Sequence, residues 1–242
     1  MIETLPLGHL KISSGDMNDL LEFIGRSISE NNKRYCVPLN LTKYITSQKD
    51  LKLKAVMRSA DLVTSDGISM VWLSRRAGYR NVYRITGIDL AEKIIVQSRA
   101  KGWKIYFLGA SPKNLGLAIN NVERKFDNPY ISGFHHGYFK QNEIQNIIEI
   151  INKSGSDILF LGLGMPQKEY FIHDYFDRIN VRFCMAVGGA FDVWADVKKR
   201  TPELIQSMGL EWLFRSYYDR SKMLNISRYG FLFLKELLFY RK

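Results

Sequence analysis

The segment DLVTSDGISMVWLSRRAGYRNVYR, residues 61–84, contains the pattern that decides the expected fold. A short apolar run opens it, Ser65-Asp66-Gly67 interrupts that run, and an amphipathic pattern follows over residues 68–77. The segment therefore predicts a strand, a sharp turn and a helix. In an open α/β sheet such a turn lies at the carboxyl edge of the strands, where ligands bind. Asp66 would act there as a general base, although Asp-Gly is also ordinary turn chemistry.

The rest of the chain repeats this alternation of strand and helix. Apolar runs predict strands at 34–39, 103–111, 130–132, 156–164 and 181–192. Helical spacing predicts helices at 41–56, from Thr86-Gly87 to 102, at 112–126, at 143–153 and from Pro166. The pattern predicts an α/β fold, with a Rossmann-like, mostly parallel sheet flanked by helices.

Composition narrows the class of protein. A chain of 242 residues that is 46% hydrophobic can bury one large core, so we expect one main domain. The net charge of +11 indicates an acidic partner, which is a nucleic acid, an anionic membrane or a phosphate-bearing substrate. Cys36 and Cys184 lie far apart in apolar runs, which favours reduced core thiols and a cytoplasmic protein. We expect no signal peptide and no transmembrane segment.

Three glycine-bearing turns could bind phosphates or sugars through backbone N–H groups. They lie at 109–111, 162–164 and 188–190, and none matches a P-loop or a dinucleotide-binding fingerprint. Tight packing of a helix on a strand is the competing explanation for these glycines. Asn40 is either a helix N-cap or a ligand contact, and both roles can hold together. His135 and His136 lack a third ligand at metal spacing, so we expect substrate contact or structural hydrogen bonding instead of zinc.

The C-terminal part has a different character. From Lys198 onward it contains ten basic and four acidic residues, a balance of +6, and nine aromatic residues. We expect two helices, at 202–219 and 221–241, that lie on an anionic bilayer, with docking on the protein's own core as the alternative. The predicted organisation is a core over residues 1–197 and a basic, aromatic-rich helical appendage over residues 198–242.

Six motifs taken in order resemble one family of enzymes. They read SDGISMVW, RITGIDL, GFHHGYF, GLGMPQKE, GGAFDVWADVKKRTP and GLEWLFRSYYDR, and they lie between about Tyr35 and Arg228. The chain resembles the WecG/TagA/CpsF bacterial glycosyltransferases, glycosyltransferase family 26. The resemblance implies transfer of a sugar, such as N-acetylmannosamine or a related hexose, from a UDP-sugar to a polyprenyl-diphosphate-linked saccharide. It also implies peripheral attachment to the inner face of the cell membrane and products such as teichoic acid, common antigen, capsule or exopolysaccharide.

The resemblance also implies roles for single residues. Asp66 matches the family's general base, Asn40 a polar residue of the same pocket, and Arg84 an arginine that could bind the donor's diphosphate. Basic residues of the C-terminal appendage complete the active site in the family, and the matching residues are Arg215, Arg220 and Arg228. The other candidate substrate contacts lie in the motifs and turns above: Thr86, Gly109, His136, Gly164, Gln167, Lys168, Glu169, Gly189 and Asp192.

Two positions depart from the family's pattern. Lys168 stands where the family usually has glutamine, which leaves Gln167 or Lys168 for that role. Asp196 stands where the family tends to have glycine, which questions the backbone conformation of that turn.

The expected mechanism is an inverting transfer without a metal or another cofactor. Arginines and helix N-termini would stabilise the departing diphosphate, and no Asp-x-Asp motif is present. The rival interpretation is a basic nucleic-acid-binding or nucleotide-binding protein without transferase activity, but no recognisable nucleic-acid motif accompanies the charge. An oxidoreductase would need the missing glycine fingerprint. The sequence leaves open the sugar, the acceptor, the polymer and whether the chain forms a homo-oligomer.

Overall fold

The computed structural model describes residues 2–202, 205, 232–233 and 236–238. The chain divides into two compact units. The first, called the hairpin unit, contains Met1–Asp19, Pro38–Thr86 and Arg200–Lys242. The second, called the sheet unit, contains Leu20–Val37 and Gly87–Lys199.

The sheet unit is built on five parallel strands in the order β3-β7-β6-β4-β5. Their bounds are β3 (Arg34–Cys36), β4 (Ile105–Gly109), β5 (Ile131–His135), β6 (Ile158–Gly162) and β7 (Phe183–Ala186). Every residue of β4 is buried, as expected for a central strand covered on both faces. The predicted α/β fold with a parallel sheet is confirmed.

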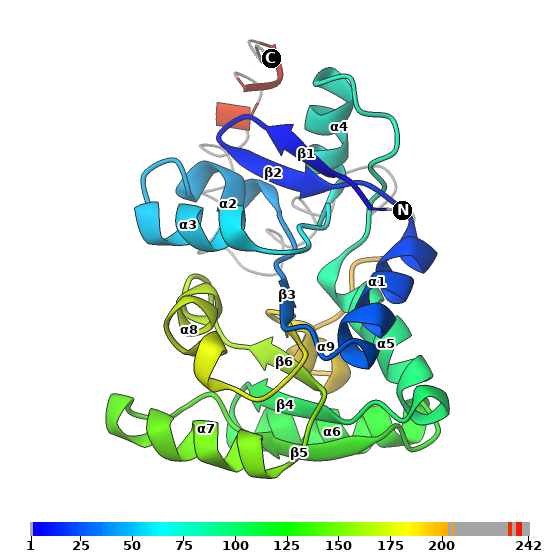
Figure 1. The fold of residues 1–242 in the computed structure, drawn as a ribbon, viewed down its shortest axis with the longest axis vertical. Coiled ribbons are helices and arrows are strands. Elements are labelled where there is room, and N and C mark those ends of the chain that lie inside the picture. Colours follow the sequence, from blue (N-terminus) through cyan, green and yellow to red (C-terminus); the bar gives the residue numbers. More distant parts are fainter. Residues whose placement is uncertain (1, 203–204, 206–231, 234–235, 239–242) are drawn as a thin grey trace. The chain divides into compact units, whose positions relative to one another are not determined.

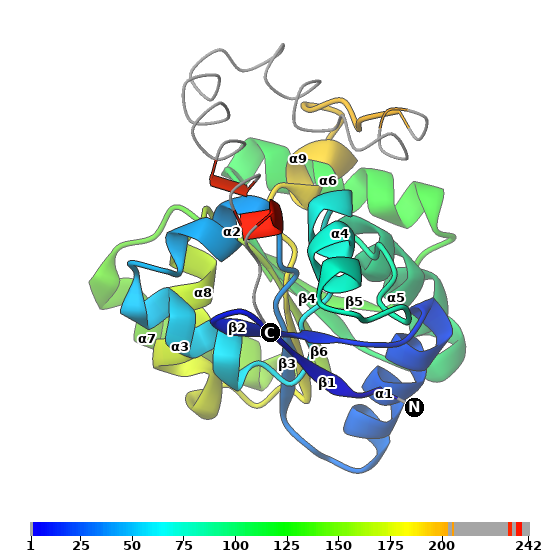
Figure 2. The same cartoon turned by 90° about the horizontal axis from the view of Figure 1, so that it is seen from above.

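Helices cover both faces of this sheet. They are α5 (Gly87–Lys101), α6 (Pro112–Lys125), α7 (Ile144–Lys153), α8 (Gln167–Tyr175), α9 (Ala190–Trp194) and the later part of α1 (Met17–Ser29), with short 3-10 turns η1 (Gln141–Glu143) and η2 (Phe176–Arg178). Figure 2 shows α7 and α8 on one side of the sheet and α1, α5 and α6 on the other. This follows from right-handed crossovers, because the chain moves outward from β4 to β5 and then back to β6 and β7.

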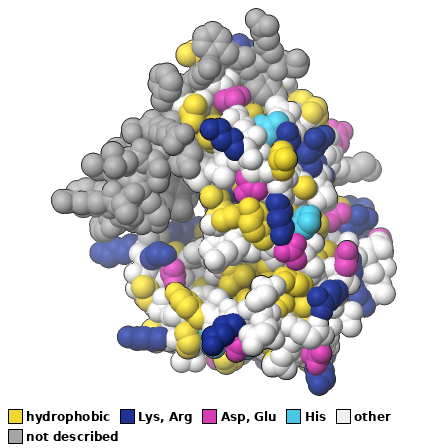
Figure 3. Space-filling model, turned by 90° about the vertical axis from the view of Figure 1, so that its left-hand side faces the viewer, with side chains coloured by type: hydrophobic (Ala, Val, Ile, Leu, Met, Phe, Trp, Pro, Cys, Tyr) yellow, Lys and Arg dark blue, Asp and Glu magenta, His cyan; other side chains and the backbone are white. Residues whose placement is uncertain are grey.

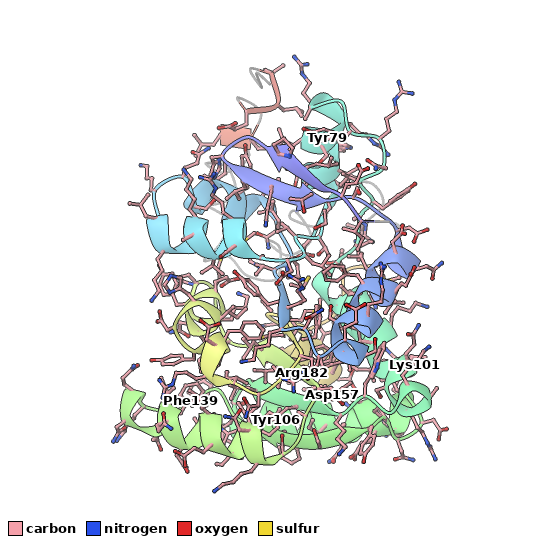
Figure 4. All side chains as sticks on the ribbon, in the orientation of Figure 1. Tyr79, Lys101, Tyr106, Phe139, Asp157 and Arg182 are labelled. Atoms are coloured by element: carbon pink, nitrogen blue, oxygen red, sulfur yellow. The ribbon has the colours of Figure 1, made fainter. Side chains whose placement is uncertain are left out.

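Asp157 connects the amino ends of the central strands. Its carboxylate accepts a hydrogen bond from the backbone N–H of Lys104 at 2.9 Å, and its carbonyl accepts one from the N–H of Arg182 at 2.8 Å. Figure 4 labels Asp157 and Arg182 at this end of the sheet. These bonds set the strand starts side by side, so the opposite, carboxyl edge is left for ligands.

The hairpin unit contains an antiparallel pair, β1 (Thr4–Leu7) and β2 (Leu10–Ser13), and three helices. The helices are α2 (Leu41–Thr46), α3 (Leu51–Ser59) and α4 (Ile68–Arg76). Figure 1 shows α2 and α3 on one side of the hairpin and α4 on the other. No element was predicted before residue 34, so the hairpin and α1 are additions to the expected fold.

Three predicted elements differ from the structure. The strand predicted over residues 61–64 is not part of the five-stranded sheet, and within the described residues this segment forms isolated bridges instead. The single helix predicted over residues 41–56 is two helices, because Asp50 starts α3 by accepting a hydrogen bond from the N–H of Leu53 at 2.9 Å. The strand predicted over residues 181–192 stops at Ala186, and α9 follows. The two helices predicted for the appendage lie almost entirely outside the described residues.

Candidate functional site

Three short parallel segments form one edge within the hairpin unit. Leu39 bridges to Ser65, and Ser65 bridges to Arg84. The N–H of Asp66 donates to the carbonyl of Leu39 at 2.9 Å, which fixes the register of the first two segments. Because the segments run in parallel, the residues that follow them meet at a common edge. The structure therefore brings together four predicted site residues: Asn40, Asp66, Arg84 and Thr86.

Asp66 lies in a turn whose next position, Gly67, has a backbone conformation that favours glycine. Gly67 has φ 120° and ψ 153°, a conformation that side-chain-bearing residues rarely adopt, and α4 begins at the next residue. The Asp66 side chain is half-buried. Within the part of the chain that the structure describes, its carboxylate forms no ion pair. A carboxylate held in this way can accept a proton from a hydroxyl group that approaches it.

Asn40 is confirmed as a helix N-cap. Its side-chain oxygen accepts a hydrogen bond from the N–H of Lys43 at 3.0 Å and begins α2. Lys43 is 4% exposed, and its ammonium donates to the carbonyl of Pro38 at 2.6 Å, which anchors the segment before Asn40. The cap uses the carbonyl oxygen of the Asn40 amide, so its NH₂ group takes no part in the cap. The proposed ligand contact of Asn40 stays compatible with the cap.

Two of the glycines at the sheet edge are required by packing. Gly109 ends β4 and pairs with Gly162 at the end of β6. A Cβ atom on Gly109 would lie 2.5 Å from the backbone of Gly162, and one on Gly162 would lie 2.6 Å from the ring of Phe191. Both distances are impossible for real Cβ contacts. Tight packing therefore explains these two glycines.

Two other glycines of the same edge have open space beside their Cα atoms. A Cβ atom on Gly189 would meet nothing within 4 Å, and one on Gly164 would meet only the side-chain oxygen of Gln167, at 3.6 Å. Both glycines are exposed. The packing explanation therefore fails for Gly164 and Gly189, and contact of these two turns with a ligand stays a prediction.

The loop after β5 passes over the turn after β4. The N–H of Gly137 donates to the carbonyl of Ala110 at 2.8 Å, which holds His136 next to that turn. Nδ1 of His135 lies 2.8 Å from the carbonyl oxygen of His136, so the structural role expected for this pair holds for His135. Among the described residues, no group of three His, Cys, Asp or Glu side chains could hold a metal ion. Contact of His136 with substrate stays a prediction.

The first turn of α8 contains a buried ion pair. Nζ of Lys168 lies 3.2 Å from Oε1 of Glu169, and the two residues are 4% and 0% exposed. Cε of Lys168 lies 3.8 Å from the Cβ position of Gly188, so the side chain reaches from α8 to the turn after β7. Gln167 is exposed at the start of the same helix. The two candidates for the family's glutamine role thus occupy very different environments.

Asp192 lies in the first turn of α9, and its carboxylate contacts two side chains from outside that helix. One carboxylate oxygen accepts a hydrogen bond from Asn114 at 3.0 Å, and the other lies 2.5 Å from the ammonium of Lys198. Asn114 is in the first turn of α6, which Ser111 caps by accepting a bond from the Asn114 N–H at 3.2 Å. Asp192 therefore joins the starts of two helices at the carboxyl edge of the sheet.

Asp196 keeps the backbone conformation of a glycine. Its φ is 57°, in the left-handed region that glycine prefers and aspartate tolerates better than most residues. The side chain accepts a hydrogen bond from Asn121 at 3.1 Å. The family's glycine is therefore replaced here without loss of the turn.

Comparison with known proteins decides the family. The model of the glycosyl transferase WecG/TagA/CpsF family matches residues 5–242. The chain belongs to this family of glycosyltransferases. One relative is the N-acetylglucosaminyldiphosphoundecaprenol N-acetyl-beta-D-mannosaminyltransferase of Bacillus spizizenii, which is 28% identical over 238 residues. The match covers 97% of this chain and 92% of the relative.

The match to the WecG/TagA/CpsF family model assigns the chain to a family and assigns no role to any single site residue. Arg215, Arg220 and Arg228 lie outside the described residues, so their roles stay predictions. Across the described ranges, no helix is both long and apolar enough to span a membrane. Sequence reasoning did not single out Asn114 or Lys198, the partners of Asp192. The available signal for Asn114 was its place in a helix that starts directly after a glycine-bearing turn.

Proposed function

We propose that this glycosyltransferase moves a sugar from a UDP-sugar to a polyprenyl-diphosphate-linked saccharide, with inversion at the anomeric carbon. The observation that supports it best is the common edge of Asn40, Asp66 and Arg84, which combines a carboxylate, an amide and a guanidinium. The Bacillus spizizenii relative is named for transfer of N-acetylmannosamine to an undecaprenyl-diphosphate-linked N-acetylglucosamine. N-acetylmannosamine is accordingly the sugar to test first.

The carboxyl edge of the sheet unit is the proposed site for the donor nucleotide. The exposed backbone at Gly164 and Gly189 allows phosphate or sugar oxygens to approach N–H groups closely. The start of α8 adds the partial positive charge of a helix N-terminus, which favours an anion there. Lys168 lies in that first turn. Its buried ion pair with Glu169 holds the Lys168 side chain in one position at the proposed site.

Asp66 is the proposed base of the transfer. It removes the proton from the acceptor hydroxyl as the oxygen attacks the anomeric carbon, and the bond to the nucleotide diphosphate breaks on the opposite side. Negative charge gathers on the departing diphosphate. Arg84 can bind two of its oxygens at once and stabilise that charge. Arg215, Arg220 and Arg228 are proposed to add to this stabilisation, so that the reaction needs no divalent metal.

The proposed setting is the inner face of the bacterial cell membrane, in the synthesis of a cell-surface polysaccharide. A polyprenyl-linked acceptor stays in the bilayer, so the enzyme must meet it at the membrane surface. The basic balance of the chain suits an anionic lipid surface. The helical appendage of residues 198–242 is the part proposed to dock there and to supply the three arginines.

A donor screen tests the proposal. The full chain is mixed with each of a panel of UDP-sugars and a short-chain lipid-diphosphate N-acetylglucosamine, with and without EDTA. We expect acceptor-dependent release of UDP with UDP-N-acetylmannosamine, unchanged by EDTA. Loss of the reaction in EDTA would contradict only the proposal that the reaction needs no divalent metal, and the proposed transfer itself would stand. Absence of transfer with every donor, together with tight DNA binding at physiological salt, would favour the nucleic-acid-binding alternative.

A further inference from the structure

One face of α4 is exposed, aromatic and basic. Trp72, Arg75 and Arg76 lie side by side on this face, because residues three and four positions apart are neighbours on a helix. Trp72 is 42% exposed, and both arginines are exposed. The opposite face of α4 is buried. A large indole ring therefore lies in water next to two guanidinium groups.

The segment after α4 continues this composition. Figure 4 shows Tyr79 at the end of α4, with nitrogen-tipped side chains extending outward beside it. Arg80 is exposed, and Tyr83 is 53% exposed. We call the five exposed residues the α4 surface: Trp72, Arg75, Arg76, Arg80 and Tyr83.

The charge of this stretch is of one sign. Residues 67–84 contain four arginines and no aspartate or glutamate. Among the described residues, Arg75, Arg76 and Arg80 form no ion pair. Figure 3 offers a contrast, because the face that it shows mixes basic side chains with acidic ones. The α4 surface thus combines exposed aromatic rings with positive charge that no acidic side chain of the described residues pairs with.

We propose that the α4 surface docks on an anionic phospholipid bilayer. Tryptophan and tyrosine are favoured at the level of the lipid headgroups, where the ring is partly desolvated and its polar group meets water. Arginine can bury its aliphatic part along the same level and keep its guanidinium near lipid phosphates. A second copy of the chain is a poorer partner, because a symmetric contact through this surface would bring the same arginines together.

Docking of α4 would also set the height of Asp66 above the membrane. Trp72 is the fifth residue of α4, so at the helical rise of 1.5 Å per residue it lies about 6 Å along the axis from Ile68, which directly follows the Asp66-Gly67 turn. A helix that meets the bilayer would therefore hold the Asp66 turn close to the headgroups. This consequence rests on the proposed function, in which the acceptor diphosphate lies at that level. The proposed contact between α4 and the bilayer does not rest on that function.

Vesicle binding tests the charge of the α4 surface. The full chain is sedimented with vesicles of phosphatidylcholine alone and with vesicles that also contain phosphatidylglycerol. One variant carries Arg75→Gln, Arg76→Gln and Arg80→Gln, and the matched control carries Lys93→Gln, Lys101→Gln and Lys153→Gln. The control changes three exposed lysines of the sheet unit and removes the same charge. We expect the arginine variant to bind phosphatidylglycerol vesicles about a hundredfold more weakly, and the lysine control much less so.

Fluorescence tests the aromatic part of the same surface. The measurement uses a Trp212→Phe variant, which leaves three tryptophans. Trp103 and Trp194 are only 7% and 5% exposed, so Trp72 is the ring that brominated lipids can reach. We expect quenching on vesicle binding, and loss of that quenching in Trp72→Phe.

The outcomes separate the contact from the transfer reaction. Equal binding by the two triple variants, or no quenching of Trp72, would overturn the proposal. The proposal would also be overturned if the chain self-associates and the arginine variant is monomeric. Tighter binding of this surface to DNA than to vesicles would overturn it as well. Neither assay needs turnover, so an inactive enzyme would leave the membrane result standing. With a soluble short-chain acceptor, the arginine variant should keep its activity.

Discussion

Lys168 and Glu169 form an ion pair of 3.2 Å in which neither residue is more than 4% exposed. Two adjacent residues of one helix thereby neutralise each other inside the edge where the donor is proposed to bind. Burial of a single charge is far more costly than burial of a pair, so removal of either charge is expected to be destabilising. The pair explains how a lysine can stand where the family usually has an uncharged glutamine.

The first prediction concerns this pair. Glu169→Gln should lower the free energy of unfolding by about 3 kcal/mol or more, because the ammonium of Lys168 is left with a neutral neighbour. Lys168→Gln with Glu169→Gln together should recover much of that loss. Urea denaturation of the two single variants and the double variant measures the coupling. Additive effects of the two changes would show that the ion pair contributes no coupling.

Asp66 is the subject of the second prediction. Asp66→Asn should leave the fold intact and lower kcat by about a hundredfold or more, the scale expected when a general base is lost. Turnover at saturating acceptor measures the effect, and circular dichroism checks the fold. Asp61→Asn is a matched control on the same segment. Near-native turnover of Asp66→Asn would reduce Asp66 to a turn residue.

The third prediction separates packing glycines from ligand-facing ones. Gly109→Ala should destabilise the protein by about 3 kcal/mol or more, because its Cβ would overlap backbone that cannot move aside. Gly189→Ala should fold with an unchanged Tm, since its Cβ meets open space, and should bind UDP about tenfold more weakly. Thermal melts and calorimetric titration with UDP report the two effects. Unchanged UDP affinity in Gly189→Ala would remove that turn from the donor site.

The turn at Asp196 allows a fourth prediction. Asp196→Val should cost about 1–2 kcal/mol more stability than Asp196→Gly, because a β-branched residue is strained at positive φ and glycine is not. Both changes remove the hydrogen bond from Asn121, so the difference between them isolates the backbone. Urea denaturation of both variants gives that difference. Equal stabilities would mean that the turn relaxes to another conformation.

The two cysteines carry the fifth prediction. Both are buried and free, as the sequence analysis predicted, and burial, with Cys36 nearby, raises the pKa of the Cys184 thiol. A thiol in the folded protein should therefore react with Ellman's reagent only after denaturation. The unfolded chain loses the Cys184 proton above about pH 8.5, whereas the folded chain keeps it, so stability should fall as the pH rises further. Cys184→Ala should show a smaller fall between pH 8 and pH 10. Rapid labelling of the native protein would contradict the burial.

Sequence patterns predicted the sheet unit well for an identifiable reason. β4 and β6 are continuous apolar runs that end in glycine, and such runs are typical of parallel strands covered on both faces. The β1–β2 hairpin lacked that signal, because its strands have four residues each and Pro6 interrupts one of them. The end of α2 was also missed, since Leu51, Leu53 and Val56 continue the helical spacing of Leu41 and Ile45 beyond the break.

The candidate site was predicted unevenly. The N-cap role of Asn40 follows from local propensity, and the structure confirms it. The meeting of Asn40, Asp66 and Arg84 depends on bridges between distant segments, which local pattern does not encode, and only the family resemblance indicated it. Likewise, Gly109 and Gly189 look alike in the sequence. Only the distances around them assign one to packing and the other to an open surface.

The pairing of β3 with β7 has a consequence for synthesis on the ribosome. Tyr35 pairs with Cys184, so among the described residues β3, the first strand of the sheet, is hydrogen-bonded to β7, the last one, and to no other strand. As the chain emerges from its N-terminus, β4, β5 and β6 can assemble while β3 still lacks a partner. Contacts of such long sequence separation form slowly, and an unpaired strand edge invites association with other chains. The nascent protein is therefore most exposed to misassembly just before residues 183–186 leave the ribosome.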